Sequence, residues 1–446
     1  MKFKKVLTFW DVFWLGVGGM VGVAVLTFPS LTFQQAGPSS LIAWILAGVF
    51  SILMALVYSE MVTAFPKSGA LVVFPYEAFG KGRFARYLAF LEGVGYYLGT
   101  VFGIVISAII LGNYIGPGYQ TGSLGSFAIA EIALLVAGVI NIFGARITSR
   151  INLLMSVFFM VLFSVIIVLA LIHGNFSNLN PFVSGTSGGL GIVYAIPVAI
   201  LAYGSWTALI TIPEETKKVK VIPKAIIYSI ITVTVLYVLL VLAVYVGLNQ
   251  TALLKTYYYY PVYGMVVLLH NGALLLAFEV AAVLAILAVM LVMIMSNARI
   301  LFALTNMRFL PQGMNKMSAR SIPIYATILS FLIPMGLSAF PGYYYQYVII
   351  GAIVGTGLPR LIDLVAYLKI RKMSNYHPSF RLKSGVLIAA VAFVGLAISE
   401  LSLGASDILW SIATIIVLTG LFIVIERRIR GGSRKKDANG HLLAVN

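Results

Sequence analysis

The chain is dominated by apolar segments long enough to cross a lipid bilayer. Of its 446 residues, 61% are hydrophobic and 10% are charged, and the mean hydropathy is +1.02. A transmembrane helix needs about 20 consecutive, mostly apolar residues. Such segments are expected at 12–34, 40–63, 86–113, 124–145, 151–173, 190–212, 223–247, 272–300, 322–341, 346–368, 383–404 and 407–426. The sequence predicts an all-α integral membrane protein of twelve spans, in contact with lipid, whose first apolar segment is retained as a span.

The basic residues predict how the spans are oriented. The net charge is +17, and 28 of the 30 Lys and Arg residues fall in the first residues, in alternate loops and in the last residues. Only Lys255, in a loop of the other side, and Arg360, inside a span, remain. Because cytoplasmic loops are enriched in Lys and Arg, both termini are expected in the cytoplasm. The positive charge therefore reflects topology, and no nucleic-acid partner is expected.

Cysteine and histidine usage argues against several kinds of chemistry. The chain has no cysteine, and its histidines, at positions 173, 270, 377 and 441, all fall in or beside expected loops. Disulfides and Cys-ligated metals are excluded, and no His cluster is visible. An intramembrane enzyme would need a nucleophile–base pair or metal ligands. We therefore expect no enzyme, no metal and no cofactor.

Glycine weakens the centre of the first span. The segment from Gly16 to Pro29 holds four glycines, and glycine holds a helix poorly. One interpretation is a close helix contact, since Gly18 and Gly22 form a GxxxG pair. The other is a broken helix whose free amides and carbonyls bind a solute at mid-membrane. This segment alone slightly favours the close contact.

The sixth span is interrupted in the same way. Pro197 and Gly204 break an otherwise apolar segment, and polar side chains cluster beside the glycine. Spans one and six occupy matching places in a five-plus-five arrangement. Paired interrupted spans are the best sequence indication of a transporter site. Together the two segments favour the solute-binding interpretation.

The most specific motif follows span six. A Glu214-Glu215-Thr216-Lys217 run precedes Ile222-Pro223-Lys224-Ala225-Ile226, which opens the next expected helix. This pattern resembles the amino acid–polyamine–organocation permease family. The span-one glycines, Glu60 with Pro66 and Gly69, and Leu310-Pro311 after span eight match the family's pattern in order. The likeness extends from about Leu7 to Arg430.

The resemblance implies a LeuT-type fold and a transport function. Two inverted five-helix repeats would cover 12–173 and 190–368, followed by two further helices within 383–426. Residues 1–11 would be a cytoplasmic segment, and 427–446 a basic cytoplasmic tail at the membrane surface. The family typically carries amino acids or related amines.

The resemblance also implies a binding site at the two interruptions. Amides of Val23, Ala24 and Val25, after Gly22, would bind a substrate carboxylate, because a helix N-terminus favours an anion. Carbonyls of the other segment residues would bind its amino group: Gly18, Gly19, Leu201, Ala202, Tyr203 and Gly204. Ser205 and Trp206 complete the expected site. Where members often have Gly-Phe-Glu, this chain has Ser205-Trp206-Thr207, so the acid is lost and the exact substrate stays open.

Acidic residues inside spans are candidates for proton coupling. Glu279 has no partner visible in sequence and ranks ahead of Glu92, whereas Arg360 and Asp363, one turn apart, are interpreted as a structural pair. Sodium-coupled relatives use span-eight hydroxyls, but 280–295 contains no Ser or Thr. Some proton-coupled relatives use a span-five lysine, and here Phe158 or Phe159 fills that position.

The sequence thus predicts a secondary transporter of a prokaryotic plasma membrane that works by alternating access. It would move an amino acid or small amine by exchange or with protons, not with sodium. The alternative is a non-transporting nutrient sensor on the same fold. The substrate, the direction of transport and the oligomeric state are left open by the sequence.

Overall fold

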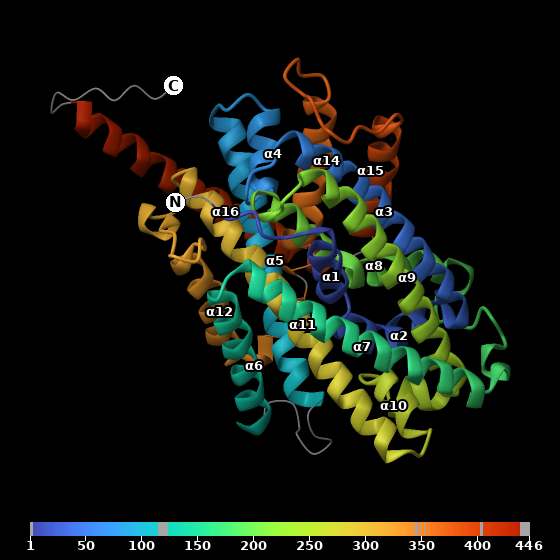
Figure 1. The fold of residues 1–446 in the computed structure, drawn as a ribbon. Coiled ribbons are helices and arrows are strands. Elements are labelled where there is room, and N and C mark those ends of the chain that lie inside the picture. Colours follow the sequence, from blue (N-terminus) through green and yellow to red (C-terminus); the bar gives the residue numbers. More distant parts are fainter. Residues whose placement is uncertain are drawn as a thin grey trace.

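The computed structural model describes residues 3–114, 124–343, 347, 348, 350, 351, 353–401 and 405–437. Figure 1 shows a bundle of long helices. Within the described residues, extended pairing is limited to two isolated bridges, Leu7 with Thr216 and Met317 with Pro323. Eight described helices are long and apolar enough to cross a membrane. The protein is therefore an all-helical, multi-pass membrane protein, as predicted.

The helices follow the apolar segments closely. The first group is α1 (Phe9–Met20), α2 (Val23–Ala36), α3 (Ser40–Ala64), α4 (Ala70–Ala78), α5 (Arg83–Tyr114), α6 (Leu124–Ile142) and α7 (Ala145–His173). The second group is α8 (Gly191–Tyr203), α9 (Ile222–Gly247), α10 (Pro261–Val267), α11 (Gly272–Asn306), α12 (Ile324–Ser338), α14 (Leu358–Ile370), α15 (Gly385–Leu401) and α16 (Ala405–Asp437). The predicted first span is split into α1 and α2, whereas the second is one continuous helix.

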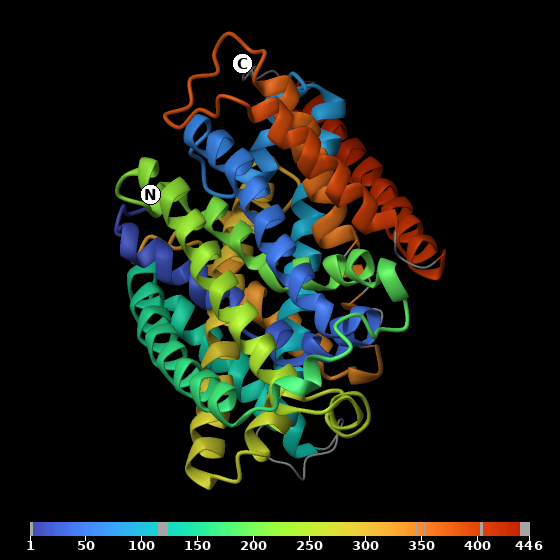
Figure 2. The ribbon, with the colours of Figure 1, turned by 90° about the vertical axis from the view of Figure 1, so that its right-hand side faces the viewer.

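The core of the bundle is built around α11 and α1. Helix α11 packs on α5, α7, α12, α6 and α1, and α1 also packs on α7 and α9. Residues 12–20 and 281–305 are mostly buried, because most apolar side chains of these stretches meet protein rather than lipid. Figure 2 shows α15 and α16 on one outer side of the bundle. The core is therefore formed by helices of the first ten expected spans.

One end of the bundle gathers most of the basic segments, and we call it the basic end. Contacts between distant segments define it: Leu7 pairs with Thr216, the Gly69 amide bonds the Thr211 carbonyl at 3.0 Å, and Arg86 donates to the Met307 carbonyl at 3.1 Å. Helix α4 lies towards this end, and α10 lies at the opposite, far end (Figure 1). The side of the membrane that this end faces stays a prediction from the basic loops.

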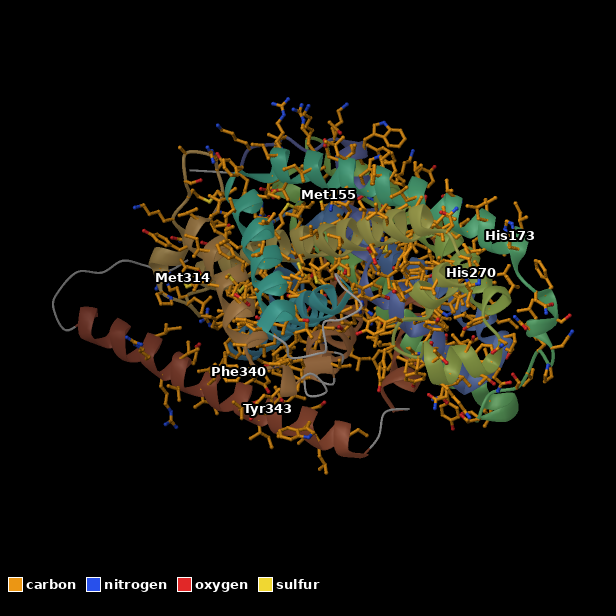
Figure 3. The ribbon with its side chains drawn as sticks, turned by 90° about the horizontal axis from the view of Figure 1, so that it is seen from below. Met155, His173, His270, Met314, Phe340 and Tyr343 are labelled. Carbon is orange, nitrogen blue, oxygen red and sulfur yellow. The ribbon has the colours of Figure 1, made fainter. Side chains whose placement is uncertain are left out.

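The histidines lie away from the centre of the bundle. His173, at the end of α7, and His270, before α11, are exposed, and Figure 3 shows His173 near the edge of the molecule in the view from below. His377 is exposed in the loop before α15, and position 441 lies outside the described residues. Within the described part of the chain, no three His, Cys, Asp or Glu side chains gather as possible metal ligands.

Candidate substrate-binding site

The first interruption lies between α1 and α2. Helix α1 ends at Met20, Val21 has extended backbone (φ −76°, ψ 109°), and a new helix begins at Val23. The first amides of α2 have no partner within their own helix. Glycine serves a second purpose here, because a Cβ on Gly22 would lie 2.6 Å from Cγ2 of Val289 on α11. The segment is therefore both a broken helix and a close helix contact.

The second interruption lies where α8 ends at Tyr203. The chain continues without a gap as a 3₁₀-helix, η4 (Gly204–Thr211), so the helix tightens at the predicted glycine instead of unwinding. A 3₁₀-helix has three residues per turn and therefore changes which side chains face the neighbouring helices. Pro197 lies inside α8 and precedes this change by about two turns.

A tyrosine on α9 connects the two interruptions. The Tyr237 hydroxyl lies 2.6 Å from the Met20 carbonyl oxygen and 3.1 Å from that of Ala202, and it can donate to either. The Met20 carbonyl stands at the end of α1, where helical partners are missing, and the Ala202 carbonyl lies where α8 passes into η4. The Tyr237 ring packs edge-to-face on Trp44 and on Tyr203. Tyr237 was not predicted from the sequence, because α9 also carries Ser229, Thr234 and Tyr245 and nothing local distinguishes Tyr237 from them.

Both interruptions line one cavity of about 780 Å³. Eight of the predicted site residues contribute to its wall: Gly19, Gly22, Val23 and Ala24 at the first interruption, and Leu201, Ala202, Gly204 and Ser205 at the second. The cavity is large enough for a small organic molecule. The two segments singled out from the sequence thus face one common space.

The other four predicted residues lie outside the wall. Gly18 faces Asn152 and Ser156 of α7, and Val25 is fully buried. Tyr203 donates its hydroxyl to the Trp44 carbonyl at 3.1 Å, and Trp206, 1% exposed, packs edge-to-face on Tyr58. These residues support the wall from behind, and their role in binding stays a prediction.

Helix α5 supplies a wall that was mostly missed from the sequence. Glu92, Tyr96, Gly99, Thr100 and Gly103 all line the cavity. Their spacing of three to four residues places them on one face of the helix. This spacing of polar and small residues is visible in the sequence and would have identified the face. Of the two proton-coupling candidates, Glu92 lines the cavity, whereas Glu279 is half-buried near the start of α11 and outside the wall.

Charged groups meet at the α5 wall. The Glu92 carboxyl contacts the carboxyl of Asp363 on α14, which the Tyr58 hydroxyl also approaches. Arg360, one turn before Asp363, lines the cavity with its Nη2 3.5 Å from the Gly204 carbonyl oxygen. Arg360 and Asp363 are thus part of a larger cluster than the structural pair predicted from sequence.

At the far end the cavity reaches a tyrosine-rich loop. Tyr258, Tyr259 and Tyr260 line it there, before α10. The Tyr258 hydroxyl donates to the Gln34 side chain at 2.7 Å, and partial burial raises the pKa of Tyr258, which keeps the proton on this donor. Tyr260 packs edge-to-face on Tyr114 of α5. The loop therefore contacts both α2 and α5 at the cavity mouth.

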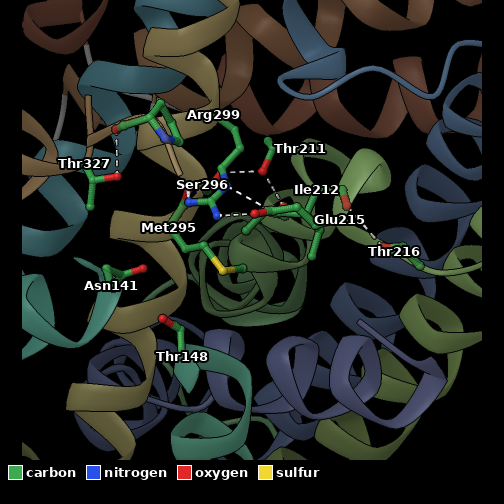
Figure 4. A network of polar contacts seen from close by, with 12 residues as sticks. Asn141, Thr148, Thr211, Ile212, Glu215, Thr216, Met295, Ser296, Arg299 and Thr327 are labelled. Carbon is green, nitrogen blue, oxygen red and sulfur yellow. Dashed lines mark hydrogen bonds and ion pairs between the residues drawn. The ribbon is translucent and has the colours of Figure 1, made fainter. Parts of the chain in front are cut away.

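At the basic end the cavity is closed by a polar network. Tyr96 lies within hydrogen-bonding distance of Thr207 and of Ser296 on α11, and Thr211 donates to Ser296 at 3.2 Å. Figure 4 shows how this network continues to Arg299. Its guanidinium binds both carboxylate oxygens of Glu215 in η5 (Pro213–Glu215), at 2.7 and 3.0 Å.

The first described residues complete this closure. Backbone amides of Val6 and Leu7 donate to the Glu215 carbonyl at 2.8 and 2.9 Å, and the Lys217 amide donates back to Leu7 at 2.8 Å. The Phe3 ring lies 5.9 Å from the Arg299 guanidinium carbon. The segment before α1 is therefore bonded across the basic end of the cavity and not free of the bundle.

Comparison with known proteins gives a single consistent result. The sequence model of a family described as "Amino acid permease" matches residues 7–422. The branched-chain amino acid permease BcaP of Bacillus subtilis (strain 168) is 26% identical over 348 residues, which cover 73% of this chain and 72% of that protein. The aspartate-proton symporter of the same organism is 26% identical over 266 residues, 57% of this chain and 50% of that protein.

Plant proteins match a shorter region. Cationic amino acid transporter 5 of Arabidopsis thaliana is 26% identical over 258 residues, which are 54% of this chain. The chain spans less than half of the length of this relative, since the match covers 44% of it. These relatives are named for branched-chain, acidic and cationic amino acids, so similarity alone does not select one class of side chain.

Proposed function

Because the chain belongs to the amino acid permease family, within the amino acid–polyamine–organocation superfamily, we propose that it is a secondary transporter for an amino acid or a related small amine. It works by alternating access in a LeuT-type fold of two inverted repeats and two further helices, twelve spans in all. The observation that carries this proposal is the common cavity lined by both interrupted helices, since such pairs form transporter sites at mid-membrane.

The shape of the cavity supports alternating access. It reaches the tyrosine-rich loop at the far end, and the Arg299–Glu215 pair closes the basic end. We assign the basic end to the cytoplasm of a prokaryotic plasma membrane, in accordance with the positive-inside rule. Both termini then lie in the cytoplasm, and the described conformation faces outward.

The charged groups of the substrate are held mainly by the first interruption. Its carboxylate binds the first amides of α2, at Val23, Ala24 and Val25, where the helix dipole favours an anion. Its amino group binds carbonyls of the first span, Gly18 and Gly19. The second span is less available for this role, because the Ala202 carbonyl is already within reach of the Tyr237 hydroxyl.

Proton coupling or exchange fits the site better than sodium coupling. A hard cation needs several oxygen ligands, and the α11 stretch from Val280 to Met295 offers no hydroxyl. On α7, the Asn152 side-chain amide donates to the Ala288 carbonyl at 3.1 Å. Phe159 of the same helix is fully buried at the position where some proton-coupled relatives carry a lysine. Glu92 ranks ahead of Glu279 as the proton carrier, in contrast to the order from sequence, because Glu92 lines the cavity.

The function is tested by uptake and binding with purified protein in proteoliposomes. We expect uptake of at least one radiolabelled amino acid, unchanged by a sodium gradient at fixed pH and voltage. Gly22→Leu should abolish binding, since even a Cβ there meets Val289. Gly336→Leu is the matched control, because a Cβ at Gly336 meets no atom within 4 Å. Loss of binding in both variants, or in neither, contradicts the shared site.

The same experiment separates the transporter from the sensor. A sensor would bind an amino acid with the affinity seen in detergent but would show neither uptake nor counterflow. A transporter shows both, and its counterflow persists without any ion gradient. Proton-driven uptake that survives in Glu92→Gln but not in Glu279→Gln would return the proton-carrying role to Glu279.

A further inference from the structure

The charged cluster beside the cavity contains more acid than base. Glu92 of α5 and Asp363 of α14 are 1% and 0% exposed, and their carboxyl groups are in contact. Arg360, 6% exposed, is the cation of this cluster. Two ionised carboxylates and one guanidinium would leave one net negative charge in the membrane interior, which is costly.

The carboxylate oxygens also have few hydrogen-bond donors. Within the described part of the chain, no hydrogen bond of good geometry reaches Oε2 of Glu92 or either oxygen of Asp363, and the one neutral donor near Asp363 is the Tyr58 hydroxyl. A buried carboxylate without donors is unstable, and two carboxylates in contact cannot both remain charged. One additional positive charge between them would satisfy both conditions.

The neighbouring elements do not supply this charge. The titratable groups that face the pair are Tyr58 on α3, Tyr96 on α5 itself and Arg360 on α14. Charged groups farther along the packed elements have their own partners in the five described ion pairs. These are Arg371 with Glu60, Arg299 with Glu215, Arg86 with Glu426, and Glu77 with both Lys67 and Lys81.

The cavity gives a mobile cation access to the pair. Glu92 is part of the cavity wall, and Asp363 lies directly behind it. The carboxylate and amino group of a substrate are assigned above to α1 and α2. The wall formed by α5 therefore faces the remaining part of the substrate, its side chain.

We propose that one positive charge neutralises the Glu92–Asp363 pair, and that this charge is either a proton or the cationic side chain of the substrate. The inference rests on the proposed transport function and specifies its substrate class. Neutral amino acids are then carried together with one proton, and lysine or arginine are carried without one. Both reactions move the same net charge, so the buried cluster is neutral in every loaded state.

The test compares L-leucine and L-lysine in proteoliposomes at clamped membrane potential. Leucine uptake is expected to rise with an inward proton gradient and to move protons with it, whereas lysine uptake is not. Each should carry one positive charge per molecule, measured as current against radiolabel. Excess lysine should also suppress the proton movement that leucine causes, a readout that needs no variant.

Three variants locate the effect. Asp363→Asn and Glu92→Gln are two separate variants that each remove one carboxylate. The remaining carboxylate is balanced by Arg360, so no further positive charge is needed for neutrality. Leucine uptake should lose its response to the proton gradient, and lysine uptake should fall about tenfold or more. Glu131→Gln is the control, because Glu131 binds Ser338 on α12, away from the cavity, and should behave as wild type.

Several outcomes overturn the inference. These are lysine uptake as proton-dependent as leucine uptake, transport of only one of the two classes, or an unchanged proton response in both carboxyl variants. Failure of the proposed function is distinguishable, because wild-type protein would then show neither uptake nor counterflow of leucine, lysine or other amino acids. In that case the inference falls with it.

Discussion

Removing the hydroxyl group of Tyr237 tests whether the two interruptions act as one unit. Tyr237→Phe keeps the ring and its packing on Trp44 and Tyr203, whose centroids lie 5.4 and 5.1 Å away. It removes the donor that serves the Met20 and Ala202 carbonyls. A buried acceptor left without its donor costs about 1–3 kcal/mol. We therefore expect a loss of stability of this size.

The loss should appear in substrate affinity as well as in stability. If the hydroxyl holds both interruptions in their binding arrangement, 1–3 kcal/mol corresponds to a Kd raised about 5- to 150-fold. With the specific unfolding entropy of soluble proteins, the same energy lowers Tm by about 1–3 °C. Thermal denaturation with and without substrate, together with scintillation-proximity binding, measures both quantities on one sample.

A second tyrosine of α9 provides the control. Tyr245, two turns later, is also fully buried, and its hydroxyl bonds Ser40 at 2.6 Å and donates to the Pro29 carbonyl at 3.1 Å. It contacts neither interruption. Tyr245→Phe should therefore lower Tm and leave Kd unchanged. Wild-type affinity in Tyr237→Phe, or an equal loss of affinity in both variants, would refute the reasoning.

Three further predictions follow from the packing. Glu215→Gln leaves the buried Arg299 charge uncompensated and should destabilise the outward-facing state by about 3–5 kcal/mol, seen as accessibility of the basic end to a thiol reagent at an introduced cysteine. Gly99→Val should prevent correct packing and lower Tm sharply, because a Cβ there meets Gly355 backbone at 2.5 Å. Trp206→Ala should lower stability by about 3–5 kcal/mol, measured by thermal denaturation. A loss of binding free energy larger than the loss of unfolding free energy would show that the ring contacts substrate.

The apolar helices and their interruptions could be predicted because their signals are local. Hydropathy over about 20 residues marks a span, and glycine at the centre marks a weak point whatever the rest of the chain does. Both interruptions occur at the predicted glycines, Gly22 and Gly204. The side chains that face the cavity were harder to predict, because η4 has a 3₁₀ period that places Ser205 and Thr207 in the wall and Trp206 behind it.

Pairings between distant helices could not be predicted from one sequence. The contact of Glu92 with Asp363 joins helices more than 200 residues apart, and nothing local to either residue indicates it. The interpretation of Arg360 and Asp363 as a structural pair used their spacing on one helix and so omitted the acid that arrives from α5. Tyr237 was missed for the same reason, since both of its acceptors lie on other helices.

The contact between α5 and the segment before α14 has a mechanical consequence. At Gly99 and Gly355 backbone meets backbone, and a Cβ on Gly95 would lie 2.6 Å from the Val354 carbonyl oxygen, within a π-helical turn, η10 (Ile353–Gly357). Interlocked side chains must change rotamer before two helices can slide, whereas bare backbones have nothing to disengage. We therefore expect α14 to slide along α5 at this contact by small shear movements. Arg360 and Asp363, which lie on α14, would move with it.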